Sequence, residues 1–273
     1  MLATSCWRPT ACLLSRTPRH RMQTIDKIGV SGKMGNQFSK WGSSMKDRVV
    51  LVTGADGGLG SHVTQALLDA GATVVGTSRK IQQSDFGDPR FTAVPAELST
   101  LEDAKKLLDQ IVARFGKLDV LAHTVGGFAG GHSVAETDDA TFQRMFDINL
   151  NSLFHMLRAT VPVLRQTGNG RIIAIGSRAA LEPGAGVGAY GAPKAAMVSL
   201  IRTVALENKD AGLTANVILP GTMDTPANRA AMANADFSKW VRPSAVASLI
   251  TWLAGDAGKD VNGAVIPVYG GEG

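Results

Sequence analysis

The chain has 273 residues, of which 44% are hydrophobic and 19% charged, a balance typical of a globular protein with a substantial core. No apolar run approaches the roughly 20 residues that a membrane helix needs, so we expect no membrane insertion. The net charge of +5 is concentrated in residues 1–45, which carry +6 and leave about −1 elsewhere; it therefore gives no support to nucleic-acid binding by residues 46–273.

Residues 1–45 form a predicted N-terminal extension that is rich in arginine, poor in acids and bears many hydroxyl groups. This composition is typical of an organelle transit peptide, so we expect a mitochondrial address. The alternatives are a cytoplasmic protein whose extension carries no address, or translation from a later methionine. Both cysteines, Cys6 and Cys12, lie in the extension, so we expect neither a disulfide nor a cysteine nucleophile in residues 46–273.

Residues 46–273 are predicted to form one domain that begins with a strand, a glycine-rich loop and a helix. An apolar run over residues 48–53 indicates a buried parallel strand, and apolar residues at helical spacing indicate a helix over 61–70. Gly54, Gly58 and Gly60 lie at this junction. Such a loop brings backbone N–H groups and a helix N-terminus against a pyrophosphate, which predicts a dinucleotide site. The alternative is a tight turn that merely needs glycine.

The choice of dinucleotide depends on the residues that follow the second strand, expected over 73–77. An acid about 20 residues beyond the glycines would bind a ribose hydroxyl and repel a 2′-phosphate. This chain has Ser78, Arg79 and Lys80 there, and a guanidinium with a neighbouring ammonium suits a phosphate. We therefore expect NADP(H). NAD(H) remains possible because Asp56 adds a negative charge to the glycine loop, and the basic turn could simply be solvated.

The rest of the chain alternates strand and helix patterns. A capping box over Ser99–Glu102 predicts the start of a helix that runs to about residue 115, and two long helices are expected over 138–166 and 188–207. Five further strands are expected over 91–94, 119–124, 171–176, 214–219 and 264–268. The result is an α/β fold with a doubly wound, seven-stranded parallel sheet. The histidines are scattered, so we expect no metal site.

Three residues in the second half carry the chemistry. Tyr190 and Lys194 are four positions apart, so their side chains share one face of a helix. Ser177 precedes Tyr190 by thirteen positions. An ammonium beside a phenol lowers the pKa of the phenol, which could then exchange a proton with a carbonyl oxygen or imine nitrogen near neutral pH. Chance matches to so short a motif are common, and bland alternatives are a loop serine and a core tyrosine.

Taken together, these motifs resemble the short-chain dehydrogenase/reductase family over about residues 47–271. The resemblance implies a single-domain Rossmann fold, a small-molecule substrate and a homodimer or homotetramer. It implies that Ser177, Tyr190, Lys194 and Asn149 are catalytic, with Asn149 the fourth residue of the set. The alternative for Asn149 is a residue that merely kinks its helix. The residues that the resemblance places at the cofactor are Gly54, Asp56, Gly58, Leu59, Gly60, Ser78, Arg79, Glu97, Gly126, Tyr190, Lys194, Pro220, Gly221 and Thr225.

By this resemblance, hydride passes between the nicotinamide and a substrate carbon. Tyr190 is then the general acid in reduction and the base in oxidation, and Ser177 hydrogen-bonds the substrate oxygen or nitrogen. Lys194 holds the nicotinamide ribose and depresses the pKa of Tyr190. Asn149 anchors a water that restores the proton through the lysine.

Two loops depart from the common family pattern and resemble the dihydropteridine reductase branch. His123–Gly126 replaces the usual Asn-Asn-Ala-Gly, and a glycine-rich stretch with Phe128 follows; residues 223–240 lie where the family has its substrate lid. Phe128 and Trp240 could flank a flat heterocycle, or both could be packing residues. Three functions follow: an NADPH-dependent carbonyl reductase, a quinonoid pterin reductase, and a non-catalytic NADP(H) sensor.

Overall fold

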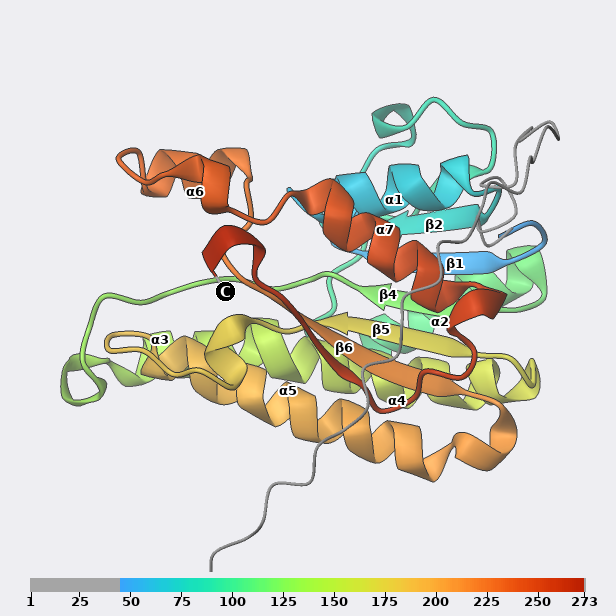
Figure 1. The fold of residues 1–273 in the computed structure, drawn as a ribbon. Helices are drawn as coiled ribbons and strands as arrows, with labels where there is room; N and C mark the ends of the chain where they lie inside the picture. The colour runs from blue at the N-terminus through green and yellow to red at the C-terminus, as the bar shows by residue number, and fades with distance from the viewer. Residues whose placement is uncertain (1–44, 273) are drawn as a thin grey trace, which may run out of the picture. The chain divides into compact units, whose positions relative to one another are not determined.

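Seven strands form one parallel sheet in the order β3-β2-β1-β4-β5-β6-β7 (Figure 1). The structure is a computed structural model and describes residues 45–272, so the predicted extension and its targeting role lie almost wholly outside the described residues. The prediction of a seven-stranded, doubly wound α/β fold is confirmed. The strands are β1 (Val49–Thr53), β2 (Thr73–Thr77), β3 (Phe91–Ala93), β4 (Val120–His123), β5 (Arg171–Ile175), β6 (Thr214–Pro220) and β7 (Val265–Val268).

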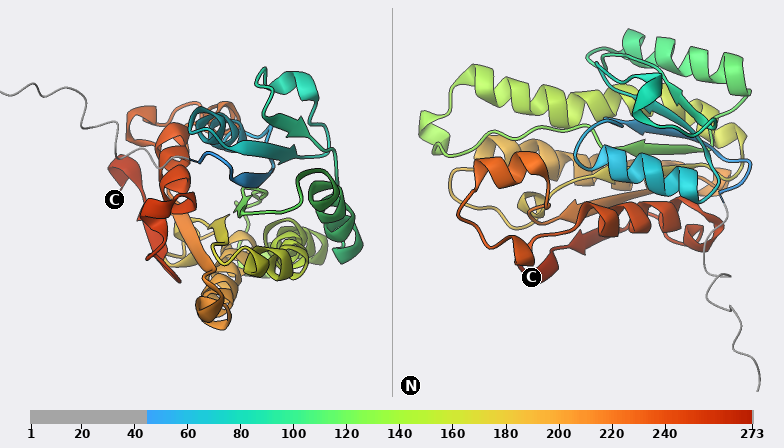
Figure 2. Two further views of the ribbon diagram at one scale, coloured as in Figure 1. Left: turned by 90° about the vertical axis from the view of Figure 1, so that its right-hand side faces the viewer. Right: turned by 90° about the horizontal axis from the view of Figure 1, so that it is seen from above.

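Helices cover both faces of the sheet, as the parallel connections require (Figure 2). On one face α1 (Gly60–Asp69) and α7 (Pro243–Ala254) pack together and against the strands. On the other face lie α2 (Leu101–Phe115), α4 (Ser152–Gln166) and α5 (Gly188–Glu207). Because the inner strands are covered twice, nearly every residue of β1, β4, β5 and β6 is buried, including polar ones.

The start of α2 differs by one residue from its prediction. Thr100 is the N-cap: its hydroxyl accepts the N–H of Asp103 at 3.1 Å, and the Asp103 carboxylate accepts the N–H of Thr100 at 3.0 Å. The capping box over Ser99–Glu102 was therefore wrong, because the extended residue that precedes the first helical residue, Leu101, is Thr100 and not Ser99. The helix ends at Gly116, whose φ of 74° is the left-handed conformation that glycine tolerates.

The helix expected over residues 138–166 contains a change of winding. It begins as α3 (Asp139–Phe146), widens into a π-helical turn over Asp147–Asn151, and continues as α4. Asn149 is in this turn and is fully buried. π-Helical turns are rare and often mark functional sites because they redirect a few backbone groups and side chains.

The segment between β6 and α7 lies beyond the carboxyl ends of the strands (Figure 1). It contains the short helix α6 (Pro226–Ala231) and a 3₁₀ turn over Phe237–Lys239. A bridge between Met223 and Val241, with an Asp224 N–H to Val241 carbonyl bond of 2.8 Å, closes its base. Within residues 45–272 no helix combines the length and the apolar character that crossing a bilayer demands.

Candidate active site

The glycine loop between β1 and α1 is shaped so that only glycine fits at two of its positions. Gly54 has a φ of +71°, and its N–H donates to the Thr77 carbonyl at 2.7 Å, which ties the loop to the end of β2. A Cβ on Gly60 would lie 1.9 Å from the Gly54 carbonyl oxygen. Gly58 is exposed and Leu59, the buried N-cap residue of α1, follows it. Bare backbone at a helix N-terminus fits the pyrophosphate of a dinucleotide.

The turn after β2 presents basic side chains to solvent beside that loop. The Ser78 hydroxyl accepts the N–H groups of Lys80 and Ile81 at 3.2 and 3.0 Å, so this side chain holds the turn. Arg79 and Lys80 are exposed, and Asp56 in the glycine loop is exposed as well. Because Gly54 and Ala55 both donate to the Thr77 carbonyl, the glycine loop and the basic turn meet at adjacent strand ends. Glu97, after β3, is also exposed.

Asn149 and Lys194 come together at Gly126, just beyond the end of β4. A Cβ on Gly126 would lie 3.0 Å from Asn149 Oδ1 and 3.3 Å from Lys194 Nζ, so a larger residue would crowd both. Asn149 Nδ2 donates to the carbonyls of Gly127 and Met145, both at 3.0 Å, and its Oδ1 accepts the Gly127 N–H at 3.1 Å. The amide therefore fixes the loop after β4 to the π-helical turn.

Lys194 is a buried cation held by a carbonyl group. It is 3% exposed, and its Nζ donates to the Ile175 carbonyl at the end of β5 at 2.8 Å. Burial lowers the pKa of Lys194 to about 8, because the charged form loses its hydration. The ammonium form still predominates at neutral pH, and such a perturbed group is typical of a functional site.

The prediction that Lys194 makes Tyr190 acidic is wrong. Lys194 Nζ lies 5.9 Å from the centroid of the Tyr190 ring and is bound to the Ile175 carbonyl. Burial raises the pKa of Tyr190, and a side-chain hydrogen bond with Ser177 opposes this only in part. The phenol therefore stays protonated at neutral pH, which suits a proton donor better than a proton acceptor.

Ser177 directly follows the glycine that ends the β5 region, and it caps a 3₁₀ turn over Arg178–Ala180. Its hydroxyl accepts the Ala179 N–H at 3.3 Å and also reaches Tyr190. The two side chains come from different elements, the end of β5 and the first turn of α5. The twelve residues between them include the loop that allows α5 to turn back along the sheet.

Three of the remaining predicted residues lie at or just after the end of β6. Pro220 is its last, buried residue, and the Gly221 N–H donates to the Val268 carbonyl at 2.9 Å, which joins this segment to β7. Thr225 is buried and caps α6 by accepting the Asn228 N–H at 3.3 Å. A Cβ on Gly58 would lie 2.9 Å from Thr225 Cγ2, so the segment after β6 lies against the glycine loop.

The two predicted aromatic residues differ in environment. Phe128 is 67% exposed and meets the Tyr190 ring edge-on, with centroids 5.1 Å apart and an interplanar angle of 73°. Trp240 is only 7% exposed and packs on Phe237, with centroids 4.7 Å apart. Only Phe128 offers a ring face beside the candidate catalytic residues, and Trp240 fits the packing alternative.

His123 is a further member of this cluster that the sequence patterns did not predict. His123 is fully buried at the end of β4, and its Nδ1 lies 3.0 Å from the Thr53 hydroxyl at the end of β1. Burial and the nearby Lys194 charge lower the pKa of His123 to about 3, so the ring is neutral. Its position near the carboxyl end of the strand predicted over residues 119–124 was the available signal.

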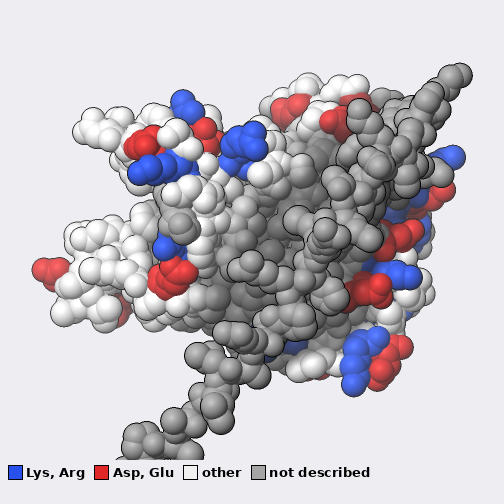
Figure 3. Space-filling model, viewed as in Figure 1, with Lys and Arg blue, Asp and Glu red and all other residues white. Residues whose placement is uncertain are grey.

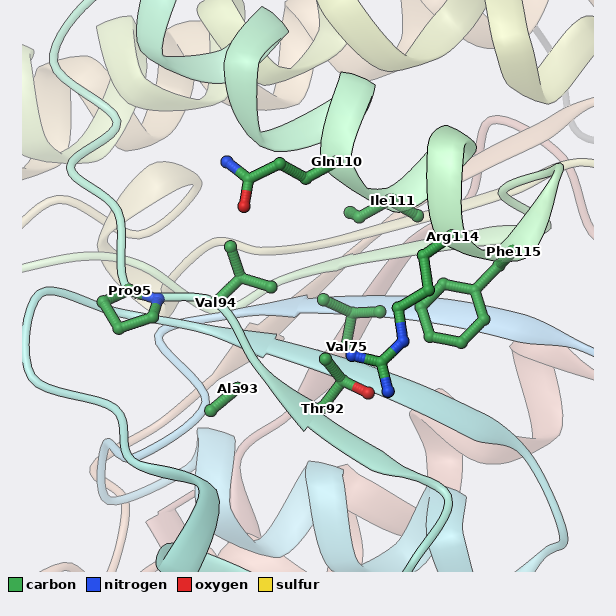
Figure 4. A pocket seen from close by; sticks show the side chains of 9 residues that line it. All are labelled: Val75, Thr92, Ala93, Val94, Pro95, Gln110, Ile111, Arg114 and Phe115. Atoms are coloured by element: carbon green, nitrogen blue, oxygen red, sulfur yellow. The ribbon is translucent and has the colours of Figure 1, made fainter.

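A pocket elsewhere in the described residues is separate from this site. A pocket of about 260 Å³ lies between β3 and α2, where Thr92, Val94, Gln110 and Arg114 line it, and it includes none of the predicted site residues (Figure 4). Figure 3 shows a notch between the lobe that carries α6 and the lobe that carries α3, at the same end of the sheet as the candidate residues. Within residues 45–272 no three potential metal ligands gather.

Comparisons with known proteins identify the class. A family model described as short chain dehydrogenase matches residues 48–236. A 3-oxoacyl-(acyl-carrier-protein) reductase of rhamnolipid biosynthesis from Pseudomonas aeruginosa is 32% identical over 251 residues, which cover 84% of this chain and 97% of that protein. The 2-dehydro-3-deoxy-D-gluconate 5-dehydrogenase of Escherichia coli is 30% identical over 244 residues, covering 84% and 96% of the two chains.

Solved structures agree with this assignment. A short-chain type dehydrogenase/reductase from Mycobacterium ulcerans has a TM-score of 0.78 at 26% identity and covers 84% of this chain and 90% of that one. The crystal structure of gox2181 has a TM-score of 0.79 at 25% identity and covers 85% and 98%. The chain belongs to the short-chain dehydrogenase/reductase family, and it is an NAD(P)-dependent oxidoreductase.

Proposed function

We propose that this protein is an NADPH-dependent reductase of a ketone or aldehyde, acting through Ser177, Tyr190, Lys194 and Asn149. The observation that carries the proposal is the convergence of these four residues from β5, α5 and the π-helical turn at the carboxyl end of the sheet. Lys194 and Asn149 both approach Gly126, and Ser177 reaches Tyr190. A serine, a protonated phenol and a buried ammonium in one place are suited to protonate a carbonyl oxygen as its carbon is reduced.

Each side chain has a role that its environment supports. The Tyr190 hydroxyl donates its proton to the substrate oxygen, and the Ser177 hydroxyl donates a hydrogen bond to the same oxygen. Lys194, whose Nζ lies 5.9 Å from the centroid of the Tyr190 ring, would hold the nicotinamide ribose. Asn149 Oδ1 accepts the Gly127 N–H with one lone pair, so the other remains to hold a water that resupplies the proton.

The cofactor, when bound, supplies the hydride. Gly54, Gly58 and Gly60 would lie under its pyrophosphate, Gly126, Tyr190 and Lys194 near its nicotinamide end, and Gly221 and Thr225 over it. Ser78 and Arg79 would meet the 2′-phosphate. The exposed Arg79 and Lys80 support NADP(H) over NAD(H), because a charge-assisted bond to a phosphate dianion is strong.

A kinetic comparison tests this function. The purified protein is mixed with NADPH or NADH and with a panel of diketones, aryl ketones, β-ketoacyl thioesters and quinonoid dihydropterin. We expect carbonyl-dependent oxidation of NADPH that exceeds that of NADH. Turnover of the dihydropterin alone would favour the pterin reductase, and tight NADP(H) binding without turnover of any substrate would favour the sensor.

Other properties implied by the family resemblance stay proposals. A homodimer or homotetramer is one, and sedimentation of the purified chain tests it. A mitochondrial address within residues 1–45 is another, and the location of a fluorescent fusion carrying those residues tests it.

A further inference from the structure

Phe128 is an exposed aromatic ring in direct contact with the proposed proton donor. With 67% of its surface exposed, it meets Tyr190 through an edge-to-face contact of 5.1 Å between centroids. An isolated exposed phenylalanine needs no explanation. Here, however, the exposed ring stands next to the hydroxyl that has to reach the substrate, so whatever approaches Tyr190 also approaches Phe128.

The backbone holds the Phe128 ring in this position. The Gly131 N–H donates to the Gly186 carbonyl at 2.8 Å, which ties the loop after β4 to the segment that leads into α5 and Tyr190. A Cβ on Gly130 would lie 2.7 Å from the Cζ atom of Phe128, so the ring rests on the bare backbone of this glycine. The angle between the Phe128 and Tyr190 rings is therefore set by two connected loops.

Exposed apolar side chains come from the loops that lead to these two rings. Val134, which is 79% exposed, lies over the first residue of α5, since a Cβ on Gly188 would come within 2.9 Å of it. Leu181, four residues after Ser177, is 54% exposed. The charged pair Arg178 and Glu182 in the same loop is joined by a 2.6 Å bond, which limits its attraction for a charged substrate.

From this arrangement we infer that Phe128 selects carbonyl compounds that carry a flat aromatic group on the carbonyl carbon. This inference rests on the proposed function and narrows its substrate class. When the substrate oxygen meets Ser177 and Tyr190, an aromatic substituent can stack on the open Phe128 face, and such pairs prefer offset or edge-on geometry. The reaction is ketone plus NADPH plus a proton giving alcohol plus NADP⁺.

Two ketones of the same size separate flatness from simple hydrophobicity. Acetophenone and cyclohexyl methyl ketone share their carbon skeleton, but only the first has a flat ring. Phe128→Leu keeps apolar volume and removes the aromatic face. Phe142→Leu is the matched control, because Phe142 is also exposed, at 45%, and packs on Phe146 in α3.

Initial rates of NADPH oxidation give kcat and KM for each pair. We expect F128L to lower kcat/KM for acetophenone by roughly threefold to tenfold, mainly through KM, which corresponds to the usual strength of an aromatic pair. The same variant should change the value for cyclohexyl methyl ketone by less than about twofold, and F142L should change neither. Equal losses for both ketones, or none for either, would overturn the inference.

Failure of the proposed function gives a different result. In that case the wild-type protein oxidises NADPH with neither ketone nor any other carbonyl compound. Saturation-transfer NMR with acetophenone and NADP⁺ then tests the contact without turnover. A signal from the aromatic protons that F128L weakens and F142L retains would support the Phe128 contact, and equal signals from all three proteins would refute it.

Discussion

Buried charged side chains are paired differently at the two ends of the strands, the amino edge and the carboxyl edge of the sheet. At the amino edge, Arg48 pairs with Asp256 at 2.8 Å, and Asp119 pairs with Lys117 at 2.8 Å and accepts the Val49 N–H at 2.8 Å. Arg171, 1% exposed, donates to the Gly170 and Gly212 carbonyls and to Asn169. These contacts fix the strand ends, although the buried Nε of Arg171 has no hydrogen-bond partner within residues 45–272.

At the carboxyl edge, Lys194 is equally buried, but its Nζ donates to a neutral carbonyl, and no carboxylate within residues 45–272 forms an ion pair with it. The pKa of Lys194 is lowered to about 8 and that of His123 to about 3. The amino edge has two salt bridges, Arg48–Asp256 and Lys117–Asp119, beside the unpaired Arg171, whereas Lys194 has none. We therefore expect the carboxyl edge to serve chemistry more than stability.

The largest effect is expected from removing the phenol hydroxyl. Tyr190→Phe should lower kcat/KM for carbonyl reduction by about 10²- to 10⁴-fold, because proton transfer to the substrate oxygen loses its donor. The chain offers a matched control, since Tyr269 is its other tyrosine and stacks on Arg178 at 4.9 Å. Steady-state NADPH oxidation should be nearly unchanged in Tyr269→Phe, and equal activity of the two variants would contradict the account.

The two buried cations should respond oppositely to methionine. Lys194→Met should lower kcat/KM by about 10²-fold and leave the free energy of unfolding equal or higher, because a desolvated charge is removed. Arg171→Met should keep most of the activity and lower the free energy of unfolding by about 3 kcal/mol, because several carbonyl partners are orphaned. Urea unfolding and NADPH oxidation on both variants measure this. Equal destabilisation by the two variants would contradict the proposed difference between the two edges.

A smaller effect is expected at the basic turn. Arg79→Asp should raise KM for NADPH by about tenfold to a hundredfold and improve use of NADH, because it removes a charge-assisted phosphate contact and adds a repulsive charge. Arg202→Ala, an exposed change on α5, is the control. An unchanged ratio of NADPH to NADH efficiency in Arg79→Asp would show that the turn is only a solvated surface.

A pH dependence of stability is expected from His123. Its pKa is lowered from 6.5 to about 3, so the unfolded chain binds a proton below pH 6.5 that the folded chain does not bind until about pH 3. Stability is therefore lost as the pH falls through this window, by at most about 1.4 kcal/mol per pH unit. His123→Asn should show a shallower loss in urea unfolding across the same range. The same slope in both proteins would place the titration elsewhere.

The part of the candidate site that we expect to hold the cofactor was predictable, because the shape of its glycine loop is set by the backbone. The strand–glycine–helix pattern predicts the loop, and the structure shows why Gly54 and Gly60 are required. Strand ends were also predicted to within about a residue, since apolar runs mark buried strands. Spacing along the chain brought Tyr190 and Lys194 onto one helix face, and family resemblance added Ser177 and Asn149.

The electrostatics and the substrate side could not be predicted. The direction of the Tyr190 pKa shift depends on burial outweighing the hydrogen bond with Ser177, which no spacing reveals. The π-helical turn around Asn149 depends on packing between α3, α5 and the loop at Gly127. Phe128 and Trp240 looked equivalent in the sequence, and only their tertiary surroundings separate an exposed ring from a packed one.

The most direct test of the central claim follows the hydrogen itself. The protein is incubated with a reactive ketone and NADPH that carries deuterium at both positions of nicotinamide C4, and the alcohol is analysed by mass spectrometry. We expect one deuterium on the carbinol carbon with the wild-type protein and Tyr269→Phe, and almost no labelled alcohol with Tyr190→Phe. Labelled alcohol in equal yield from Tyr190→Phe, or none from the wild-type protein with any carbonyl compound, would contradict the account.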